Sequence, residues 1–315
     1  MKKKTKTFAQ KVRNKQKVIL YEFLPPPKTL GTTETKISIK QFATILGSYN
    51  VDAINIPEVR EETRSGKRSN PVLLKLEPRV VHAHLSKHAS CDVIINRPVV
   101  YLPWKKQKRW FLETYNTYGI RNFIFVGGES SKIIYPGLTV SQTAKKLKTT
   151  HKNDFPDIFL GGITIPTRKN EAKRVFAKAS SGIEFFTTQV LYEAEKSKKF
   201  LKEYDVLCQK NNTLPKTIIL SFAPAVTPKD LDLLSWLGVE ISAKTVRLIT
   251  TGWLGIGFRS LDICQNVFED ILTFTIKNHI KVPLGLNVEH ISRHNFEISL
   301  LLLQRLSGIY NSYTP

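Results

Sequence analysis

The feature that most constrains the fold is a series of eight short apolar runs, which alternate along the chain with segments of helical spacing. The runs are nearly continuous rather than alternately apolar and polar, a pattern typical of parallel strands buried on both faces. Strands and helices in this order predict a (β/α)8 TIM barrel, an α/β fold in a single domain. The predicted strands are residues 18–24, 51–57, 80–86, 121–129, 157–165, 183–193, 217–224 and 282–289.

The length and the ends of the sequence fit one barrel. A chain of 315 residues accommodates a single barrel, which typically takes about 250 residues. Residues 1–16 are rich in lysine and lack apolar periodicity, so we expect a flexible basic arm, with the barrel over residues 17–315. No apolar run approaches the roughly 18 residues that span a bilayer. With three widely spaced cysteines, no CxxC pair and no signal peptide, the sequence predicts a cytoplasmic protein that does not bind membranes.

The charge balance indicates anionic partners. There are 48 Lys and Arg residues against 26 Asp and Glu residues, a formal net charge of +22. Such a chain is expected to meet nucleic acid, a phosphate-bearing cofactor or a polyanionic substrate. The lysines are scattered over the predicted helices, which is more typical of a solvated surface than of a binding groove. No nucleic-acid-binding motif is recognisable, so only nonspecific binding through the arm is expected.

Polar residues interrupt the predicted strands at or near their ends. Buried amides and hydroxyls cost about 1–3 kcal/mol unless they are hydrogen-bonded, so such residues are either paired within the protein or placed at a ligand. The C-terminal ends of barrel strands surround one opening, where active sites lie. The ligand interpretation is therefore favoured for the group as a whole. Its members are Glu22, Asn55, His84, Glu129, Thr188, Gln189 and Glu289.

Four segments resemble the methylenetetrahydrofolate reductase family. Tyr21-Glu-Phe-Leu-Pro-Pro26 resembles the EFFPP segment that opens these enzymes, and Ala83-His-Leu-Ser86 is similar to their HLT segment on strand 3. Asn122–Glu129 stands where the family carries its strand-4 LRGD motif, and the segment from Lys178 to Gln189 resembles K-x-x-x-G…TQ. The resemblance covers residues 17–225 well and the last strand only loosely.

The resemblance implies a flavin-dependent reductase that converts 5,10-methylenetetrahydrofolate to 5-methyltetrahydrofolate. FAD would lie in the barrel opening, with electrons from NAD(P)H or from a partner protein. Glu22 would be the general acid that opens the substrate to its iminium form, since an apolar strand favours the protonated carboxyl. Gln189 and Thr188 would bind the pterin, and the flavin-side residues would be His84, Gly128, Glu129, Glu171 and Lys178.

Other interpretations of these residues stay open. Glu22 could be a core carboxylate paired with a buried cation, and Lys178 a solvent-facing helical lysine. His82 and His84 lack a third ligand of matching spacing, so no metal site is predicted. Where the family has Arg-Gly-Asp, this chain has Gly127-Gly-Glu129. The two glycines could allow a cofactor to approach the backbone closely, or could form a plain turn.

Three functions are therefore carried forward. The first is the flavin-dependent reductase, with a folate substrate that carries one or more glutamates and with a homo-oligomeric assembly. The second is a divergent barrel that binds folate or a related pterin with weak or no flavin binding. The third is a basic nucleic-acid-associated protein, for which charge is the only support.

Overall fold

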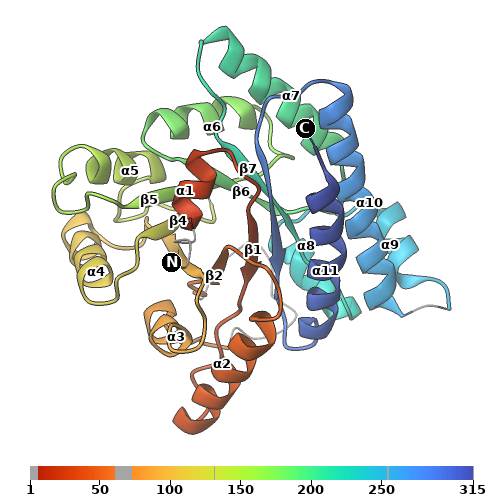
Figure 1. Ribbon diagram of the computed structural model, residues 1–315, viewed down its shortest axis with the longest axis horizontal. Coiled ribbons are helices and arrows are strands. Elements are labelled where there is room, and N and C mark those ends of the chain that lie inside the picture. Colours follow the sequence, from red (N-terminus) through yellow and green to blue (C-terminus); the bar gives the residue numbers. More distant parts are fainter. Residues whose placement is uncertain (1–5, 61–72, 131, 254, 315) are drawn as a thin grey trace, which may run out of the picture. The chain divides into compact units, whose positions relative to one another are not determined.

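The computed structural model of the chain describes residues 6–60, 73–130, 132–253 and 255–314. Eight parallel strands form a closed barrel in chain order, and helices connect them (Figure 1). This is a (β/α)8 TIM barrel, so the predicted fold class is confirmed. The strands are β1 (Ile19–Glu22), β2 (Ala53–Pro57), β3 (Asp92–Pro98), β4 (Asn122–Val126), β5 (Phe159–Thr164), β6 (Phe185–Val190), β7 (Thr217–Phe222) and β8 (Leu284–Glu289).

Several helices begin at local capping signals. The side chains of Thr139 and Thr227 each accept a hydrogen bond from the backbone N–H three residues later. The side chain of that later residue accepts from the threonine's own backbone N–H, which completes a capping box. Pro228 occupies the first helical turn, where a missing N–H costs nothing. The helices are α1 (Phe8–Arg13), α2 (Thr32–Leu46), α3 (Pro78–Leu85), α4 (Trp104–Asn116), α5 (Val140–Lys148), α6 (Glu171–Ser180), α7 (Glu195–Lys210), α8 (Pro228–Trp236), α9 (Ala243–Thr250), α10 (Ile256–Lys277) and α11 (Phe296–Ser312).

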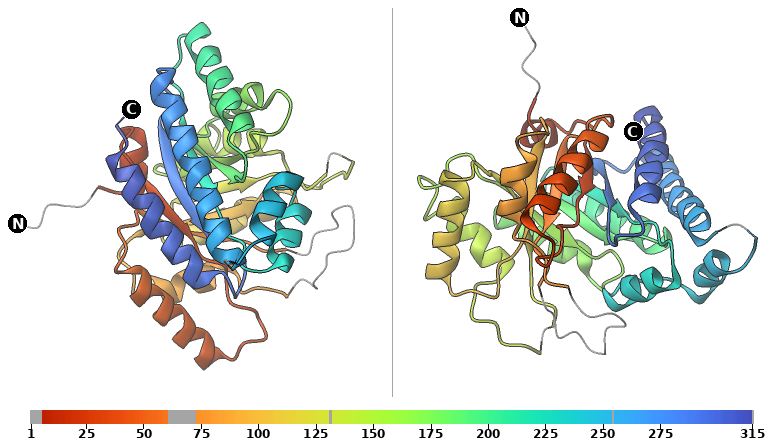
Figure 2. Two further views of the ribbon diagram at one scale, coloured as in Figure 1. Left: turned by 90° about the vertical axis from the view of Figure 1, so that its right-hand side faces the viewer. Right: turned by 90° about the horizontal axis from the view of Figure 1, so that it is seen from below.

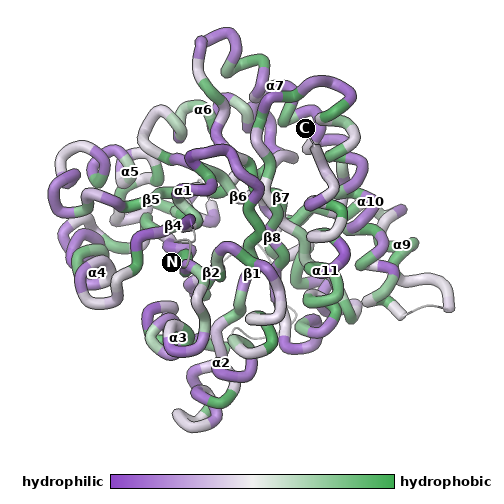
Figure 3. The backbone as a smooth tube through the Cα atoms, viewed as in Figure 1, coloured by the Kyte–Doolittle hydropathy of each residue, from purple (hydrophilic) through white to green (hydrophobic). Residues whose placement is uncertain are grey.

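Within this fold the described residues form two compact units. The first unit comprises residues 6–60, 73–130, 132–162 and 180–184, and it contains β1 to β4 with the beginning of β5. The second comprises residues 163–179, 185–253 and 255–314, and it contains β6, β7 and β8. In the second unit all six residues of β7 are buried, and the tube in Figure 3 is hydrophobic along β7 and β8. Helices α10 and α11 run side by side there (Figure 2).

The third strand lies elsewhere than the sequence predicts. Residues 80–86 were expected to be a strand, but they belong to helix α3, and β3 is Asp92–Pro98. In α3 the buried residues Pro78, Val81 and Leu85 recur at helical spacing, and Pro78 stands in the first turn. The apparent alternation of Val80, His82 and His84 therefore belongs to a helix, and the predicted strand is wrong.

The prediction of a flexible arm is wrong for the part of it that the structure describes. Residues Phe8–Arg13 form α1, which begins at a capping box made by Thr7 and Gln10. Phe8 is 1% exposed, and its ring meets that of Phe159 edge to face with 5.7 Å between centroids. Val12 is also buried. The arm therefore contributes two buried side chains to the core. Isolated apolar residues in a basic sequence do not predict such packing.

Helix α1 is also held by polar contacts to the beginnings of strands in the first unit. The Phe8 backbone N–H donates to Asp92 Oδ2 at 2.6 Å. Lys11 forms an ion pair with Asp52, just before β2, and Arg13 pairs with Glu184 at 3.0 Å, just before β6. Two cations of the predicted polyanion-binding arm are thus paired within the chain; the lysines at positions 2 to 4 lie outside the described residues. In the part of the chain that the structure describes, no helix has the length and apolarity to cross a membrane.

Candidate functional site

The ends of β1, β2 and β3 bring a carboxylate and two amides together in the first unit. Glu22 is the last residue of β1 and is in register with Asn55 of β2. Asn55 Nδ2 donates to Glu22 Oε2 at 2.8 Å, and Asn96 Nδ2 of β3 donates to the same oxygen at 3.1 Å. Two amide donors on one oxygen stabilise negative charge at Glu22 Oε2.

The same two amides hold unsatisfied acceptors. Asn55 is 1% exposed and Asn96 is half-buried. Among the described residues, neither Asn55 Oδ1 nor Asn96 Oδ1 has a hydrogen-bond partner, although both atoms are buried. A buried, unpaired carbonyl oxygen costs about 1–3 kcal/mol, a cost that a ligand N–H removes. The cluster of Glu22, Asn55 and Asn96 therefore has the chemistry of a binding site.

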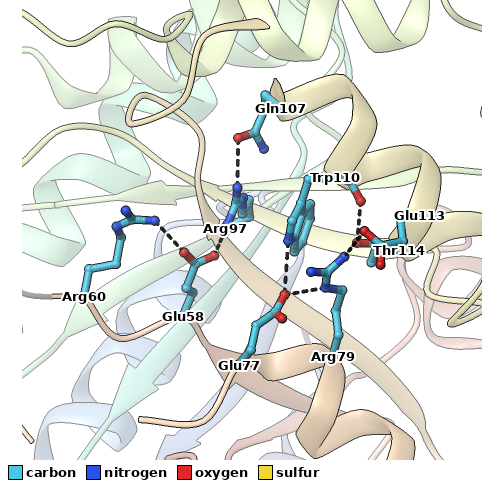
Figure 4. A network of polar contacts seen from close by, with 9 residues as sticks. All are labelled: Glu58, Arg60, Glu77, Arg79, Arg97, Gln107, Trp110, Glu113 and Thr114. Atoms are coloured by element: carbon cyan, nitrogen blue, oxygen red, sulfur yellow. Dashed lines mark hydrogen bonds and ion pairs between the residues drawn. The ribbon is translucent and has the colours of Figure 1, made fainter. Parts of the chain in front are cut away.

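A network of charged groups fixes the ends of β2 and β3 beside this cluster (Figure 4). Arg97 Nη1 donates to Glu58 Oε2, and its Nη2 donates to Gln107 Oε1 of α4 at 3.0 Å. The Arg97 guanidinium lies 4.0 Å from the centroid of the Trp110 ring. Burial lowers the pKa of Arg97, and Glu58 partly offsets this. The Glu58 N–H also donates to the Asn96 carbonyl at 3.1 Å, so the network holds the backbone of a site residue.

The network continues from Trp110 to helix α3. The Trp110 indole N–H donates to Glu77 Oε1 at 3.2 Å, and Arg79 pairs with both Glu77 and Glu113, the latter at 2.9 Å (Figure 4). Because α3 carries Arg79 into this network, the segment that the sequence assigned to a strand serves to anchor the end of β3 from outside.

The Gly-Gly turn after β4 is covered by the chain's own tyrosine. A Cβ placed on Gly128 would lie 2.8 Å from the Tyr135 hydroxyl oxygen and closer still to its ring carbons. The hydroxyl accepts from the Ser130 N–H at 3.2 Å, and the ring meets Tyr101 edge to face at 5.3 Å. A side chain at position 128 would therefore force the Tyr135 ring to move, although position 128 itself is exposed. The predicted site residue Glu129 follows directly and is half-buried.

We predict that Gly128→Ala lowers the free energy of unfolding by about 1–3 kcal/mol, because the new methyl group overlaps the Tyr135 ring. Gly127→Ala is the matched control: the added Cβ would meet only Val140, at 3.9 Å, so a change within about 0.5 kcal/mol is expected. Urea unfolding measures both variants. Equal losses in the two variants would contradict the assignment of Tyr135 as the obstacle.

Glu171 and Lys178 hold the end of β5 in the second unit. Glu171, in the first turn of α6, accepts from the Thr164 hydroxyl and the Ile165 N–H, both at 3.1 Å. Lys178 Nζ donates to the Ile163 carbonyl at 2.7 Å. Burial lowers the pKa of Lys178, and the nearby Glu171 partly offsets this. Both side chains thus close the connection from β5 to α6.

Thr188 and Gln189 also have partners within the second unit. The β6–β7 register shifts between Thr187 and Val190, and Thr188 Oγ1 accepts the Ser221 N–H at 2.9 Å at this irregularity. Gln189 Nε2 donates to the Leu237 carbonyl at 2.8 Å. The threonine hydroxyl thus replaces a backbone acceptor at a bulge.

Ser221 continues into β8. Asn287 Nδ2 donates to Ser221 Oγ at 3.0 Å and to Glu289 Oε1 at 3.1 Å. Burial raises the pKa of Glu289 to about 7, and hydrogen bonds from Ser221 and Asn287 lower it only in part. Glu289 therefore keeps its proton to a much higher pH than an ordinary glutamate.

The structure separates His84 from the other predicted residues. His84 lies on α3, so the argument that placed it at the end of a strand no longer holds. Its pKa is lowered by burial and by Lys87 and Lys36. The sequence analysis missed Asn96 and Arg97, although these polar residues directly end the apolar run from Val93 to Ile95 and would have marked the true third strand.

Comparison with known proteins supports the fold. No protein-family model and no curated protein matches the chain. An uncharacterised protein from Clostridium thermocellum that binds two copies of 5-methyl-5,6,7,8-tetrahydrofolic acid has a TM-score of 0.78 at 21% identity, over 95% of this chain and 99% of that one. Dihydropteroate synthase from Xanthomonas albilineans has a TM-score of 0.45 at 9% identity over 94% of both chains. EDTA monooxygenase from Chelativorans sp. BNC1 has a TM-score of 0.49 at 10% identity over 95% of both.

Proposed function

We propose that this chain binds a reduced folate that carries a one-carbon unit, and that Glu22 exchanges a proton with it. The observation that carries the proposal is the cluster in which two amides donate to Glu22 Oε2 while their own buried carbonyl oxygens have no partner among the described residues. The segment around Glu22 is also the one that resembles methylenetetrahydrofolate reductases. The similar Clostridium thermocellum protein binds 5-methyl-5,6,7,8-tetrahydrofolic acid, which supports the same class of ligand.

The cluster suits folate chemistry. Reduced folates present several N–H donors, which Asn55 Oδ1 and Asn96 Oδ1 can accept. The carboxyl of Glu22, which both amides hold in place, is the group that gives a proton. On a methylene-bridged folate this proton goes to the nitrogen that leaves, the electron pair of the broken C–N bond stays on that nitrogen, and the methylene carbon becomes an iminium.

Several of the residues predicted to hold a flavin make contacts within the chain or do not lie at a strand end. The glycine cradle at Gly128 is filled by the ring of Tyr135, and His84 lies on a helix rather than at a strand end. Glu171 and Lys178 use Oε1 and Nζ to close the β5–α6 connection. We therefore derive no step through a flavin, and the proposed activity is folate binding with proton exchange.

We predict that Asn55→Leu and Asn96→Leu each weaken binding of 5-methyltetrahydrofolate about tenfold or more, because each removes an acceptor and a donor to Glu22. Asn122→Leu is the matched control, since Asn122 is a buried asparagine at the start of β4 whose Nδ2 donates to the Val93 carbonyl. Its binding is expected to stay within about threefold of wild type. Calorimetric titration measures all four proteins; equal affinities would overturn the proposal.

Flavin-dependent reduction is the second candidate, favoured by the position of Glu22 at the end of β1 before Pro25-Pro26. The visible absorbance spectrum of the protein, before and after addition of FAD, separates the two candidates. A bound flavin that NAD(P)H bleaches and methylenetetrahydrofolate restores would establish the reductase. Reduced-folate binding without a flavin spectrum supports the proposed function.

A further inference from the structure

A chain of hydrogen bonds joins the ends of three strands in the second unit. The Ser221 N–H of β7 donates to Thr188 Oγ1 of β6, and Ser221 Oγ accepts from Asn287 Nδ2 of β8. Ser221 and Asn287 are register partners, so the bond crosses directly between neighbouring strands. Asn287 Nδ2 gives its second proton to Glu289 Oε1 at 3.1 Å. Asn287 and Glu289 are two residues apart on one strand and therefore share a face.

One member of this hydrogen-bond chain, Asn287, has an acceptor oxygen without a partner. Asn287 is 0% exposed, and within the described ranges its Oδ1 has no hydrogen-bond partner. Both protons of its Nδ2 are already donated. Turning the amide over would leave the nitrogen unpaired instead, so either orientation leaves one polar atom without a partner. Buried groups of this kind are rare in native proteins and call for an explanation such as a ligand.

Glu289 supplies the complementary group. Burial raises the pKa of its carboxyl to about 7, so this side chain keeps its proton closer to neutral pH than an ordinary glutamate does. A protonated carboxyl donates, whereas the neighbouring Asn287 Oδ1 accepts. Because Asn287 Nδ2 and Glu289 Oε1 are only 3.1 Å apart, one ring edge can meet both side chains.

We propose that Asn287 and Glu289 form a binding edge for a heterocycle that carries an N–H beside a carbonyl, such as the pyrimidinone edge of a pterin. Asn287 Oδ1 accepts the ring N–H, and the carboxyl of Glu289 donates to the ring carbonyl. Ser221 and Thr188 hold Asn287 in place through the hydrogen-bond chain. This inference rests on the proposed function, because a pterin is part of the ligand class proposed there.

The test uses two ligands that differ only at this edge. Tetrahydrofolate has the ring N–H and carbonyl, whereas 4-amino-4-deoxytetrahydrofolate has an amino group in place of the carbonyl and no adjacent N–H. Anaerobic calorimetric titration of the wild type is expected to show a preference of about tenfold or more for tetrahydrofolate. In Glu289→Gln the amide N–H still donates, so the preference is retained. In Glu289→Leu and Asn287→Leu it falls to within about threefold.

The outcomes separate this inference from the proposed function. If the wild type binds neither ligand, the proposed function fails and the inference fails with it. If the wild type binds both with equal affinity, the pterin edge is not read here and the inference alone is overturned. A preference that survives in a folded Glu289→Leu protein also overturns it, with folding checked by circular dichroism and urea unfolding. The comparison on the wild type needs no variant to fold.

Discussion

Replacing Arg97 by methionine is expected to lower the free energy of unfolding by about 3–5 kcal/mol, the usual cost of removing one partner of a buried ion pair. Arg97 is 3% exposed, and its guanidinium contacts Glu58, Gln107 and the face of Trp110 at once (Figure 4). Methionine fills much of the space that the arginine side chain occupies. The loss of stability therefore comes from the Glu58 carboxylate and the Gln107 carbonyl, because both lose the Arg97 donor. Urea unfolding monitored by tryptophan fluorescence measures the change.

Arg60→Met is the matched control, because it removes the other cation on the same carboxylate. The Arg60 side chain is 34% exposed and pairs with Glu58 Oε1 at 2.7 Å. An ion pair with this access to solvent contributes at most about 1 kcal/mol. If Arg97→Met costs no more than Arg60→Met, the buried network is not what holds the ends of β2 and β3. The double variant Arg97→Met with Glu58→Leu should recover part of the loss, since it also removes the carboxylate that has lost its buried partner.

The barrel was predictable because the alternation of apolar strands with helical segments is repeated along the chain. The error arose where one local sequence pattern was compatible with both a strand and a helix. Seven predicted strands overlap real ones. The third predicted strand, residues 80–86, failed because Val80, His82 and His84 have the alternate spacing of a strand. The residues that are buried, Val81 and Leu85, have the spacing of a helix. The true third strand contains Asn96 and Arg97, two polar residues that interrupt its apolar run near its C-terminal end. Polar residues at the end of a strand shorten its apolar run and make the strand harder to recognise in the sequence.

The candidate site was predictable in position but only partly in its contacts. Glu22 and Asn55 were anomalies in apolar runs, and the parallel register brings them together. The partners of Thr188 and Lys178 depend on a register shift in β6 and on the path from β5 to α6, neither of which is encoded in residue type. Likewise, the glycine at position 128 indicated that another group lies close to the backbone. Whether that group is a cofactor or Tyr135 depends on the fold of the following loop.

Removing the ionisable group of Glu289 is expected to stabilise the protein at alkaline pH and to leave it unchanged at acid pH. Its pKa is raised from 4.5 to about 7 by burial in the folded chain. Below about pH 4.5 both the folded and unfolded states are protonated, so the group contributes nothing. Between the two values the unfolded chain binds fewer protons, so stability falls as the pH rises. Above about pH 7 the whole penalty applies, about 3 kcal/mol for this shift.

Glu289→Gln removes that penalty, because an amide of nearly the same shape still accepts from Asn287. The difference in free energy of unfolding between variant and wild type should therefore grow from about 1 kcal/mol at pH 5 towards about 3 kcal/mol at pH 8. Glu195→Gln is the control, since its side chain is 84% exposed on α7 and the variant reports the loss of a surface carboxyl with its exposed ion pair to Lys198. Urea unfolding across this range decides the matter without any ligand. A difference that stays constant with pH would show that Glu289 ionises in the folded protein as freely as in the unfolded chain, and that its surroundings on β7 and β8 do not hold a proton there.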